Sequence, residues 1–565
     1  MITFIDNRLT VETATQTAVF ENGCLCSLIS KLDGKTYLSC RPDAAPMSIV
    51  FVQDHVYPMD NGTIETRKLS DTQAEVIVHS WYGDGAIRIG VDEPTGDVLV
   101  RPSAYADRPG VKGLRYDIRG IAADLEAVLP VYQGVRLRQD DPLLVGQVFP
   151  WPNGWEAGFA IYEGADAAGF WLHCQDDRFN FKTLYCGEPD DPYRVGLACI
   201  AHGPLDDNTS AGSVTWRLNV FTGGWRVPAQ RYKDWLWNAY GLEQQRRKRP
   251  DWLYDLKFAV SFSRADIGVL RALEKWVDPK KVLVHVSSWR TDGYDQNYPT
   301  YNANPAAQEM FRYGREKGFH IMPHTNSMQI DPGHPAYLLL QNQALRDLDT
   351  KKVVGWAYNH ELWLKTDQPV DVPYSTYARV QPYNRKANIM PTIHCGCSMW
   401  HSVLREQIQH IADDYGVDAC FVDVVFGAAN SHNGLVEGRS HAEGALELLR
   451  YLSEINGGLL IGGENANELT AQGQGIGQMH LYQSWHFSKP GLERTGGDVA
   501  VGDFLYGELC RMYGYAAIGG RDENERIRMR VHADHNCIPT VDSLSAEELE
   551  HPNKAVKALL EAAGA

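Results

Sequence analysis

After Pro250 the sequence alternates apolar runs of strand length with amphipathic segments of helix length, and this alternation constrains the fold most. Strands separated by helices of this length form parallel βαβ units. The number of units favours a closed (β/α)8 TIM-type barrel over residues 256–565 rather than an open doubly wound sheet. The apolar runs are "LKFAVSF" (256–262), "KVLVHVSSW" (281–289), "FHIMPHTN" (319–326), "VDACFVDVVFG" (417–427) and "GLLIGGEN" (458–465).

Residues 1–228 show a different pattern, in which short alternating runs are broken by Gly, Asn and Asp. The stretch "TQAEVIVHSWYGDGAIRIGVDEPTGDVLVR" (72–101), for example, alternates apolar and polar residues between turn signals. This spacing predicts an antiparallel β-sandwich. Residues 229–255 begin as an amphipathic helix and end in a basic, Pro-terminated stretch, which predicts a helical linker with solvated charges. The predicted fold class is therefore multidomain, a β-sandwich followed by an α/β barrel.

Composition excludes several classes of partner. The 565 residues are 44% hydrophobic and carry a formal net charge of −17, which argues against nucleic acid as a partner. No apolar stretch approaches the roughly 18 residues of a membrane helix, and the N-terminus lacks the pattern of a secretory signal. The 11 cysteines are odd in number and contain no CxxC pair, so we expect reduced thiols in a cytoplasmic protein. The oligomeric state stays open.

One short motif, "IHCGC" (393–397), places His394 beside Cys395 and Cys397. Nothing nearby completes a four-ligand zinc site, so these residues are interpreted as core thiols beside a histidine. We therefore predict no metal and no cofactor.

Polar residues gather where the predicted barrel strands end, which is where TIM barrels carry their chemistry. Asp423 ends the fourth strand and Glu464 ends the fifth. The segment "MHLYQSWHF" (479–487) is predicted as strand six and places Trp485 and His486 at its end. The segment "RIRMRVHADHN" (526–536) is predicted as strand seven, and it contributes His532, Asp534 and His535.

Asp423 and Glu464 are separated by 41 residues, about one helix-plus-strand repeat, so we expect them on adjacent strands. Adjacent strands lie about 4.8 Å apart, which suits the roughly 5–5.5 Å between the two carboxyl groups of a retaining glycosidase. Asp423 would be the nucleophile and Glu464 the acid/base, with its pKa raised by the neighbouring charge. The alternative for either acid is a structural role, capping a helix or pairing with an arginine.

Aromatic residues of the predicted barrel are the second indication of a sugar substrate. Sugar rings stack on aromatic faces, although any single Trp can instead be packed in the core. The polar neighbours that would bind sugar hydroxyls, together with Trp289, are Asp292, Asp295, His324 and Asn326; Trp485, His486, His532 and Asp534 complete the predicted substrate contacts. The aromatic set is Trp289, Tyr294, Tyr298, Tyr301, Trp356, Trp363, Trp400 and Trp485.

A sandwich, a connector ending "RPDWLYDL", and a barrel with "FVDVVF" then "IGGEN" resemble the endo-α-N-acetylgalactosaminidases and related glycosidase-like barrels. The resemblance implies a retaining α-glycosidase acting on a galactoside-like or N-acetylgalactosaminide-like sugar. It implies the nucleophile at Asp423, the acid/base at Glu464 and a third acid at Asp534. Amylases have an Arg where Phe421 stands, which speaks against α-glucans. The α-galactosidase and α-glucosidase barrels place their acid/base on strand six, where "MHLYQSWHF" has no carboxylate.

Three alternatives remain open from the sequence. A metal-dependent barrel hydrolase would use His324, His532, Asp534 and His535, although the first strand lacks the usual histidines. A non-catalytic barrel would bind carbohydrate without turnover. A transglycosylase or lyase would use the same two acids. The sugar, the linkage and endo or exo action are not determined by these motifs.

Overall fold

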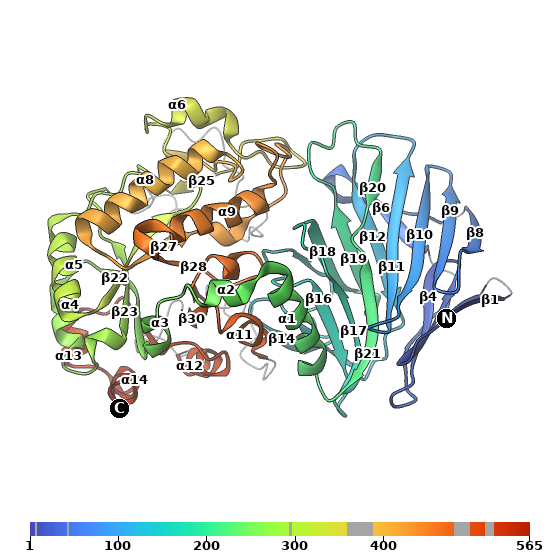
Figure 1. The fold of residues 1–565 in the computed structure, drawn as a ribbon, viewed down its shortest axis with the longest axis horizontal. Coiled ribbons are helices and arrows are strands. Elements are labelled where there is room, and N and C mark those ends of the chain that lie inside the picture. The colour runs from blue at the N-terminus through green and yellow to red at the C-terminus, as the bar shows by residue number, and fades with distance from the viewer. Residues whose placement is uncertain are drawn as a thin grey trace. The chain divides into compact units, whose positions relative to one another are not determined.

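The computed structural model describes residues 1–5, 8–41, 45–60, 62–292, 297–358, 388–479, 498–514 and 525–565. The chain divides into two compact units, Met1–Tyr240 and Gly241–Ala565 (Figure 1). The predicted linker, 229–255, is shared between them: helix α1 (Arg226–Tyr240) falls in the first unit, and α2 (Leu242–Arg246) and α3 (Trp252–Asp255) in the second. No helix in the described ranges combines the length and the apolar character needed to cross a membrane.

The first unit consists of three antiparallel sheets, as the turn-broken sequence pattern predicts. The first sheet contains, in chain order, β1 (Ile2–Ile5), β2 (Arg8–Glu12), β3 (Gln16–Glu21), β4 (Cys24–Ser30) and β5 (Thr36–Ser39). The second runs in the order β15 (Gln147–Pro150), β18 (Phe181–Glu188), β19 (Asp191–Ile200), β12 (Val111–Arg119), β6 (Met47–Phe51) and β7 (His55–Pro58).

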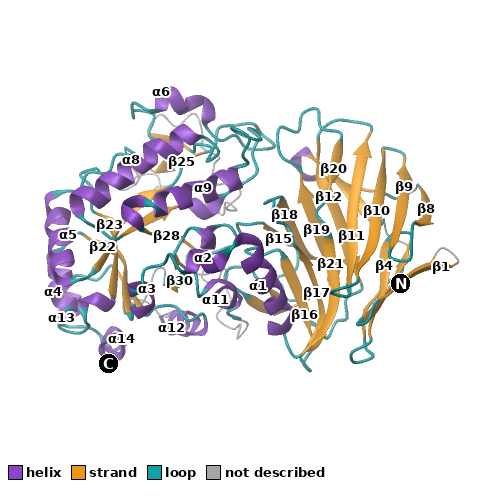
Figure 2. Ribbon diagram, viewed as in Figure 1, coloured by secondary structure: helices purple, strands orange, loops and turns teal. Residues whose placement is uncertain are grey.

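The largest sheet has ten strands. Its order is β14 (Val135–Arg138), β13 (Glu126–Leu129), β16 (Phe159–Glu163), β17 (Ala168–Cys174), β21 (Trp216–Thr222), β11 (Asp97–Ala106), β10 (Gly83–Asp92), β9 (Gln73–Ser80) and β8 (Thr63–Lys68), with β20 (Ser210–Gly212) paired to β11. Figure 2 shows these strands as the dominant element of the unit.

The alternation of apolar and polar residues explains why the segment 72–101 forms strands. Ala74, Val76 and Val78 of β9 are buried, and the residues between them are more exposed. Val76 is paired with Ile87 and Ala74 with Ile89, which are buried as well. One face of the pair is thus apolar throughout, which the two-residue period of a strand requires.

Helix α1 is tied to the first unit by a buried carboxylate. Asp97 is fully buried, and its oxygens accept hydrogen bonds from Arg217 (2.9 Å) and Arg231 (2.9 Å). Arg231 lies on α1, where Tyr232 is also buried. A buried carboxylate is tolerated when cations and donors surround it, and this pairing holds the helix in the first unit.

The second unit is built on an eight-stranded parallel sheet, which confirms the predicted barrel. The order is β30 (Arg511–Tyr513), β29 (Ile476–Gln478), β28 (Leu460–Glu464), β27 (Ala419–Asp423), β24 (His320–Asn326), β23 (Val282–Ser288), β22 (Phe258–Arg264) and β31 (Thr540–Asp542). The two ends of this order meet, because Ile538 forms a parallel bridge with Tyr513 and donates its N–H to the Met512 carbonyl (2.8 Å). The sheet is therefore closed.

Helices cover the outside of the barrel (Figures 1 and 2). They are α4 (Ile267–Leu273), α5 (Pro305–Lys317), α8 (Ser398–Tyr415), α9 (His441–Ser453), α11 (Val501–Tyr506), α12 (Glu525–Asp534), α13 (Ala546–Glu550) and α14 (Lys554–Gly564). The long connection after β24 adds α6 (Tyr337–Leu340) and the hairpin β25 (Gly355–Tyr358) with β26 (Asn388–Pro391).

Local sequence signals mark the ends of these helices. The Asn304 side chain accepts the Ala307 N–H, Pro305 occupies the first position, and Gly318 ends α5 in the left-handed conformation. Helix α9 begins with a capping box formed by Ser440 and Glu443. The helices of the βαβ pattern are thus delimited by their own sequence.

Two strand predictions are wrong. Residues 526–536, predicted as strand seven, lie largely in helix α12, and the seventh strand is β30. The sixth strand is β29, which ends at Gln478, just before the predicted segment 479–487. Both true strands have only three residues, which is too short for a two-residue period to be recognised in sequence.

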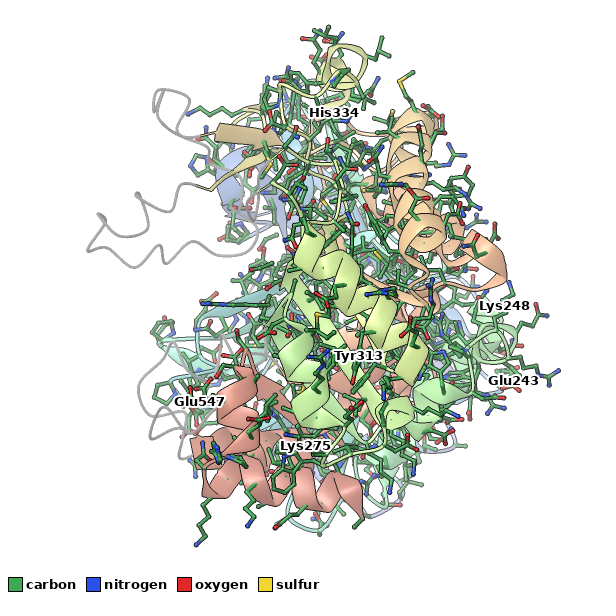
Figure 3. All side chains as sticks on the ribbon, turned by 90° about the vertical axis from the view of Figure 1, so that its left-hand side faces the viewer. Glu243, Lys248, Lys275, Tyr313, His334 and Glu547 are labelled. Atoms are coloured by element: carbon green, nitrogen blue, oxygen red, sulfur yellow. The ribbon has the colours of Figure 1, made fainter. Side chains whose placement is uncertain are left out.

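The basic end of the connector is not uniformly solvated, which corrects the interpretation of its charges. Glu243 and Lys248 do extend outward (Figure 3). The Arg249 guanidinium instead turns inward, and burial lowers its pKa. It donates hydrogen bonds of 2.8–3.2 Å to four carbonyls, those of Ala471, Gly473, Gln474 and Leu509.

Replacing Arg249 with Leu should lower the free energy of unfolding by about 2–4 kcal/mol, because four carbonyls lose their donor. Urea denaturation measures this change. The matched control is Arg247→Leu, whose side chain is 74% exposed, and it should change stability by less than about 0.5 kcal/mol. Equal effects of the two substitutions would contradict the role assigned to Arg249.

Candidate active site

The barrel strands end at a common edge, and their register decides which side chains stand at one level there. Asn326 on β24 is paired with Asp423 on β27. Farther around the barrel, Glu464 on β28 is paired with Gln478 on β29, and Gln478 with Tyr513 on β30. Each of these five polar residues is the last residue of its strand, and the five strands are successive in the barrel.

The two predicted acids stand at the ends of β27 and β28, which are paired in parallel. Phe421 is paired with Gly462, and the same register two residues farther sets Asp423 beside Glu464. Phe421 belongs to the apolar cluster inside the barrel. Side chains two residues apart on a strand share a face, so Asp423 faces the interior as well.

Both carboxylates are shielded from solvent. The Asp423 side chain is 16% exposed, and Glu464 is 6% exposed. Burial, together with the charges of Glu464 and Asp423, raises the pKa of the Tyr513 hydroxyl well above its usual value. Two largely buried carboxylates at the ends of neighbouring strands are unfavourable for folding, which is typical of a functional site.

The backbone turns sharply directly after each acid. Val424 has φ 57° and Asn465 has φ 49°, both in the left-handed region. Asn tolerates this conformation, whereas a β-branched Val does not, and the strain is on the order of 1–3 kcal/mol. Strain that persists beside a buried carboxylate indicates a position held by the surrounding structure.

The turn after Glu464 is held by side-chain hydrogen bonds. The Asn467 amide oxygen accepts the N–H groups of Leu469 (3.0 Å) and Thr470 (2.9 Å). Gln474 donates its amide N–H to the Asn465 carbonyl. These bonds satisfy polar groups in a buried loop, so the turn that follows Glu464 is fixed.

His324 lies beside Asp423, with its Nε2 3.5 Å from Asp423 Oδ2. Three interior residues near this edge were not among the residues predicted from the sequence: His285, Gln478 and Tyr513. The sequence pattern could have indicated His285, because it is a polar residue at an inward position of an apolar strand. Gln478 and Tyr513 lie on the two strands that were misplaced.

The remaining polar candidates on described strands and loops have local partners. The Asn326 side-chain oxygen accepts the N–H groups of Met328 (3.0 Å) and Gln329 (2.9 Å), so Asn326 shapes its own turn. Asp292 accepts a long hydrogen bond from the Asn297 amide (3.4 Å). Asp295, Trp485 and His486 lie outside the described residues.

The aromatic residues that the structure describes are packed rather than open, which corrects their expected role as stacking platforms. Trp289, Tyr298, Tyr301 and Trp400 are each no more than 1% exposed. Trp289 donates its indole N–H to the His324 carbonyl (2.9 Å), and its ring packs on Tyr301. Tyr294, Trp363 and the side chain of Trp356 lie outside the description.

The predicted third acid does not stand at a strand end. Asp534 is exposed on helix α12, where it faces Arg530 (3.8 Å). His532 of the same helix is buried, and its ring packs against Gly514, directly after β30. The metal-hydrolase alternative needs these residues together with His324, and within the described ranges no three potential ligands gather at one point.

The "IHCGC" motif is buried core. His394 accepts the Gly396 N–H (3.0 Å), and the Cys395 N–H is donated to His441 (3.3 Å). Burial raises the pKa of the Cys395 thiol to about 12. All eleven cysteines lie within the described residues and are thiols rather than disulfides.

A family model described as a domain of unknown function (DUF6259) matches residues 212–445. No curated protein matches the chain. Among solved structures, the α-N-acetylgalactosaminidase NagBb from Bifidobacterium bifidum in complex with GalNAc has a TM-score of 0.65 and 14% sequence identity, covering 95% of this chain and 92% of that chain. A quadruple mutant of NagBb has a TM-score of 0.69 and 13% identity, covering 98% and 93%.

A sulfoquinovosidase of family GH31 from E. rectale, in complex with an aza-sugar inhibitor, is also similar. Its TM-score is 0.53 at 9% identity, with 99% of this chain and 81% of that chain covered. At these identities the likeness establishes a shared fold. The glycosidase-like layout predicted from the sequence resemblance is thereby confirmed.

Replacing Trp289 with Phe should lower the free energy of unfolding by about 1–3 kcal/mol, because the change leaves a void and removes the donor to the His324 carbonyl. Thermal and urea unfolding report this loss. Trp81→Phe is the control, since Trp81 is 75% exposed and should change stability by less than about 0.5 kcal/mol. Wild-type stability of the Trp289 variant would show that its packing is not important.

Proposed function

We propose that the protein is a retaining glycoside hydrolase that acts on α-glycosidic bonds, with Asp423 as the nucleophile and Glu464 as the acid/base. One observation carries the proposal: β27 and β28 are parallel neighbours in register at Phe421 and Gly462, and Asp423 and Glu464 each stand two residues farther on, at the carboxyl ends of these strands. The fold shared with an α-N-acetylgalactosaminidase supports this class of reaction and favours a galactoside-like or N-acetylgalactosaminide-like sugar.

In this mechanism Asp423 attacks the anomeric carbon while Glu464 protonates the departing oxygen. A covalent glycosyl-enzyme results. Glu464, now ionised, then removes a proton from water, which attacks the same carbon and releases the sugar. The spacing of neighbouring strands, about 4.8 Å, supports this double displacement rather than the wider separation of about 6.5–9.5 Å used for inversion.

Several finer features belong to the same proposal. Asp292, Asp295, Trp485 and His486 remain proposed contacts to the sugar. The eleven thiols support a reducing compartment such as the cytoplasm.

The two acids can be tested separately on aryl α-glycosides. Asp423→Ala should lower kcat by at least about 10³-fold, because the nucleophile is lost. Glu464→Ala should slow hydrolysis of the glycosyl-enzyme, and azide should restore about 10-fold or more by attacking without a general base. Steady-state release of the aryl group, with and without azide, measures both effects.

A matched control lies at the other end of the same strand segment. Asp418 precedes β27, its side chain is 46% exposed, and it is 2.6 Å from His320 Nδ1. Asp418→Asn should leave kcat within about twofold of wild type. Near-wild-type rates for both Asp423→Ala and Glu464→Ala would refute the assigned pair, whereas binding of glycosides without turnover by the wild type would favour the non-catalytic alternative.

The stereochemical outcome gives an independent prediction. Double displacement inverts the anomeric carbon twice, so the first-formed sugar should be the α-anomer. Proton NMR during the first minutes of hydrolysis distinguishes it from the β-anomer before mutarotation. Initial release of the β-anomer would replace the covalent mechanism with direct attack by water.

A further inference from the structure

Three buried rings connect the far side of the barrel to Asp423. The Tyr513 hydroxyl on β30 is 2.9 Å from His285 Nδ1 on β23. His285 Nε2 is 3.0 Å from His324 Nδ1 on β24, and His324 Nε2 is 3.5 Å from Asp423 Oδ2 on β27. Tyr513 and His285 are fully buried, and His324 is 2% exposed.

Apolar rings enclose the two imidazoles. Phe421 stacks on His285 and on His324, with ring centroids 4.3 and 5.0 Å away. Phe262 packs against His285 at 5.1 Å. Such surroundings disfavour a charged imidazole. Burial, and then the neighbouring His324, lower the pKa of His285 well below its usual value, so His285 stays neutral.

Neutral rings allow only two directions for the chain of hydrogen bonds, because each imidazole has one donor nitrogen and one acceptor nitrogen. In the first, Tyr513 donates to His285, His285 donates to His324, and His324 turns its Nε2–H toward Asp423. In the second, every bond is reversed, and a nitrogen lone pair faces the carboxylate. The negative charge of Asp423 is attracted by the first arrangement and repelled by the second.

We propose that Tyr513, His285 and His324 are positioning residues, whose one-directional hydrogen bonds present an N–H to Asp423 and hold it as an oriented, ionised carboxylate. The inference rests on the proposed function, in which Asp423 is the nucleophile. It adds three residues: His324 lies against the nucleophile itself, whereas Tyr513 and His285 act on Asp423 only through His324. Tyr513 sets the direction, because a phenol kept protonated by burial donates to the nearest imidazole nitrogen.

The other described groups near Asp423 do not stabilise its negative charge, so this role falls to the N–H of His324. Glu464 stands at the same level on the neighbouring strand and opposes a second negative charge. Tyr301 is also within electrostatic reach of Asp423, but its hydroxyl is engaged with Asn326, whose N–H it accepts (2.9 Å). Among the described neighbours, His324 is thus the group placed to favour the ionised form of Asp423.

The direction of the bonds can be read without any substrate. In protein labelled with ¹⁵N at histidine, neutral His285 should be protonated on Nε2, and His324 should carry its proton on the Nε2 that faces Asp423. His285→Gln and His324→Gln assign the two signals. Tyr513→Phe removes the donor that sets the direction, so His285 should show a mixture of tautomers. We call the line of hydrogen bonds from Tyr513 through His285 to His324 the relay. A proton on Nδ1 of either neutral ring in the wild type would overturn it.

Kinetics then test the link to Asp423. Tyr513→Phe should lower kcat/KM about 10-fold and His324→Gln about 100-fold. Without the N–H the carboxylate ionises less readily, so the acidic limb of the pH profile should move to higher pH by about 0.5–1 unit. The double variant should be no worse than His324→Gln alone, because both changes break one chain.

The matched control is Tyr116→Phe, which removes another buried hydroxyl, one that donates to the Gly23 carbonyl (3.1 Å) in the first unit. It should leave the pH profile unchanged. A purely structural role of Tyr513 would give an unmoved acidic limb and additive losses, and that result would overturn the relay.

The NMR and kinetic measurements distinguish failure of the proposed function from failure of the relay. If the wild type turns over no glycoside, the proposed function fails, while the tautomers of His285 and His324 still decide whether the relay exists. If the wild type is active and Tyr513→Phe changes neither kcat/KM nor the acidic limb, the proposed function stands and the relay to Asp423 falls.

Discussion

Each strand of the barrel is hydrogen-bonded to its neighbours in one parallel register, and a slip of one residue on β27 or β28 would turn Asp423 or Glu464 out of the interior. That register is maintained by the closed sheet, in which Ile538 completes the ring against Tyr513. The five polar residues that end successive strands gather at one edge of the barrel only because every strand keeps its register. The proposed chemistry depends on this constraint more than on any single contact.

Near the carboxyl ends of the strands, the barrel interior is polar, whereas a TIM barrel usually packs branched aliphatic residues inside. Its groups satisfy one another across the barrel: Tyr513 bonds His285, and Gln478 donates to the Ser261 hydroxyl (2.9 Å). A buried network is stable only when its members are paired. The unfavourable features, two adjacent acids and the strained Val424, are concentrated at the strand ends, which is the distribution expected of a catalytic site.

Much of this could be predicted where the sequence carries a strong period. The first five barrel strands, the antiparallel first unit and the placement of Asp423 and Glu464 at strand ends follow from hydrophobic patterning and repeat length. The three-residue strands β29 and β30 have no such period, so Gln478 and Tyr513 were not recognised. The aromatic residues misled for a different reason, because composition cannot distinguish an open Trp from one that, like Trp289, is fully buried.

The order of strands and helices follows from the amino-acid pattern, because apolar periodicity and helix capping are local properties of the chain. The same pattern also determined that Asp423 and Glu464 would be one repeat apart. The line of hydrogen bonds from Tyr513 through His285 to His324, which ends 3.5 Å from Asp423, depends on the folded barrel. Their strands are not all neighbours in the sheet, and barrel closure, a long-range event that no local pattern encodes, brings their side chains across the interior to one another.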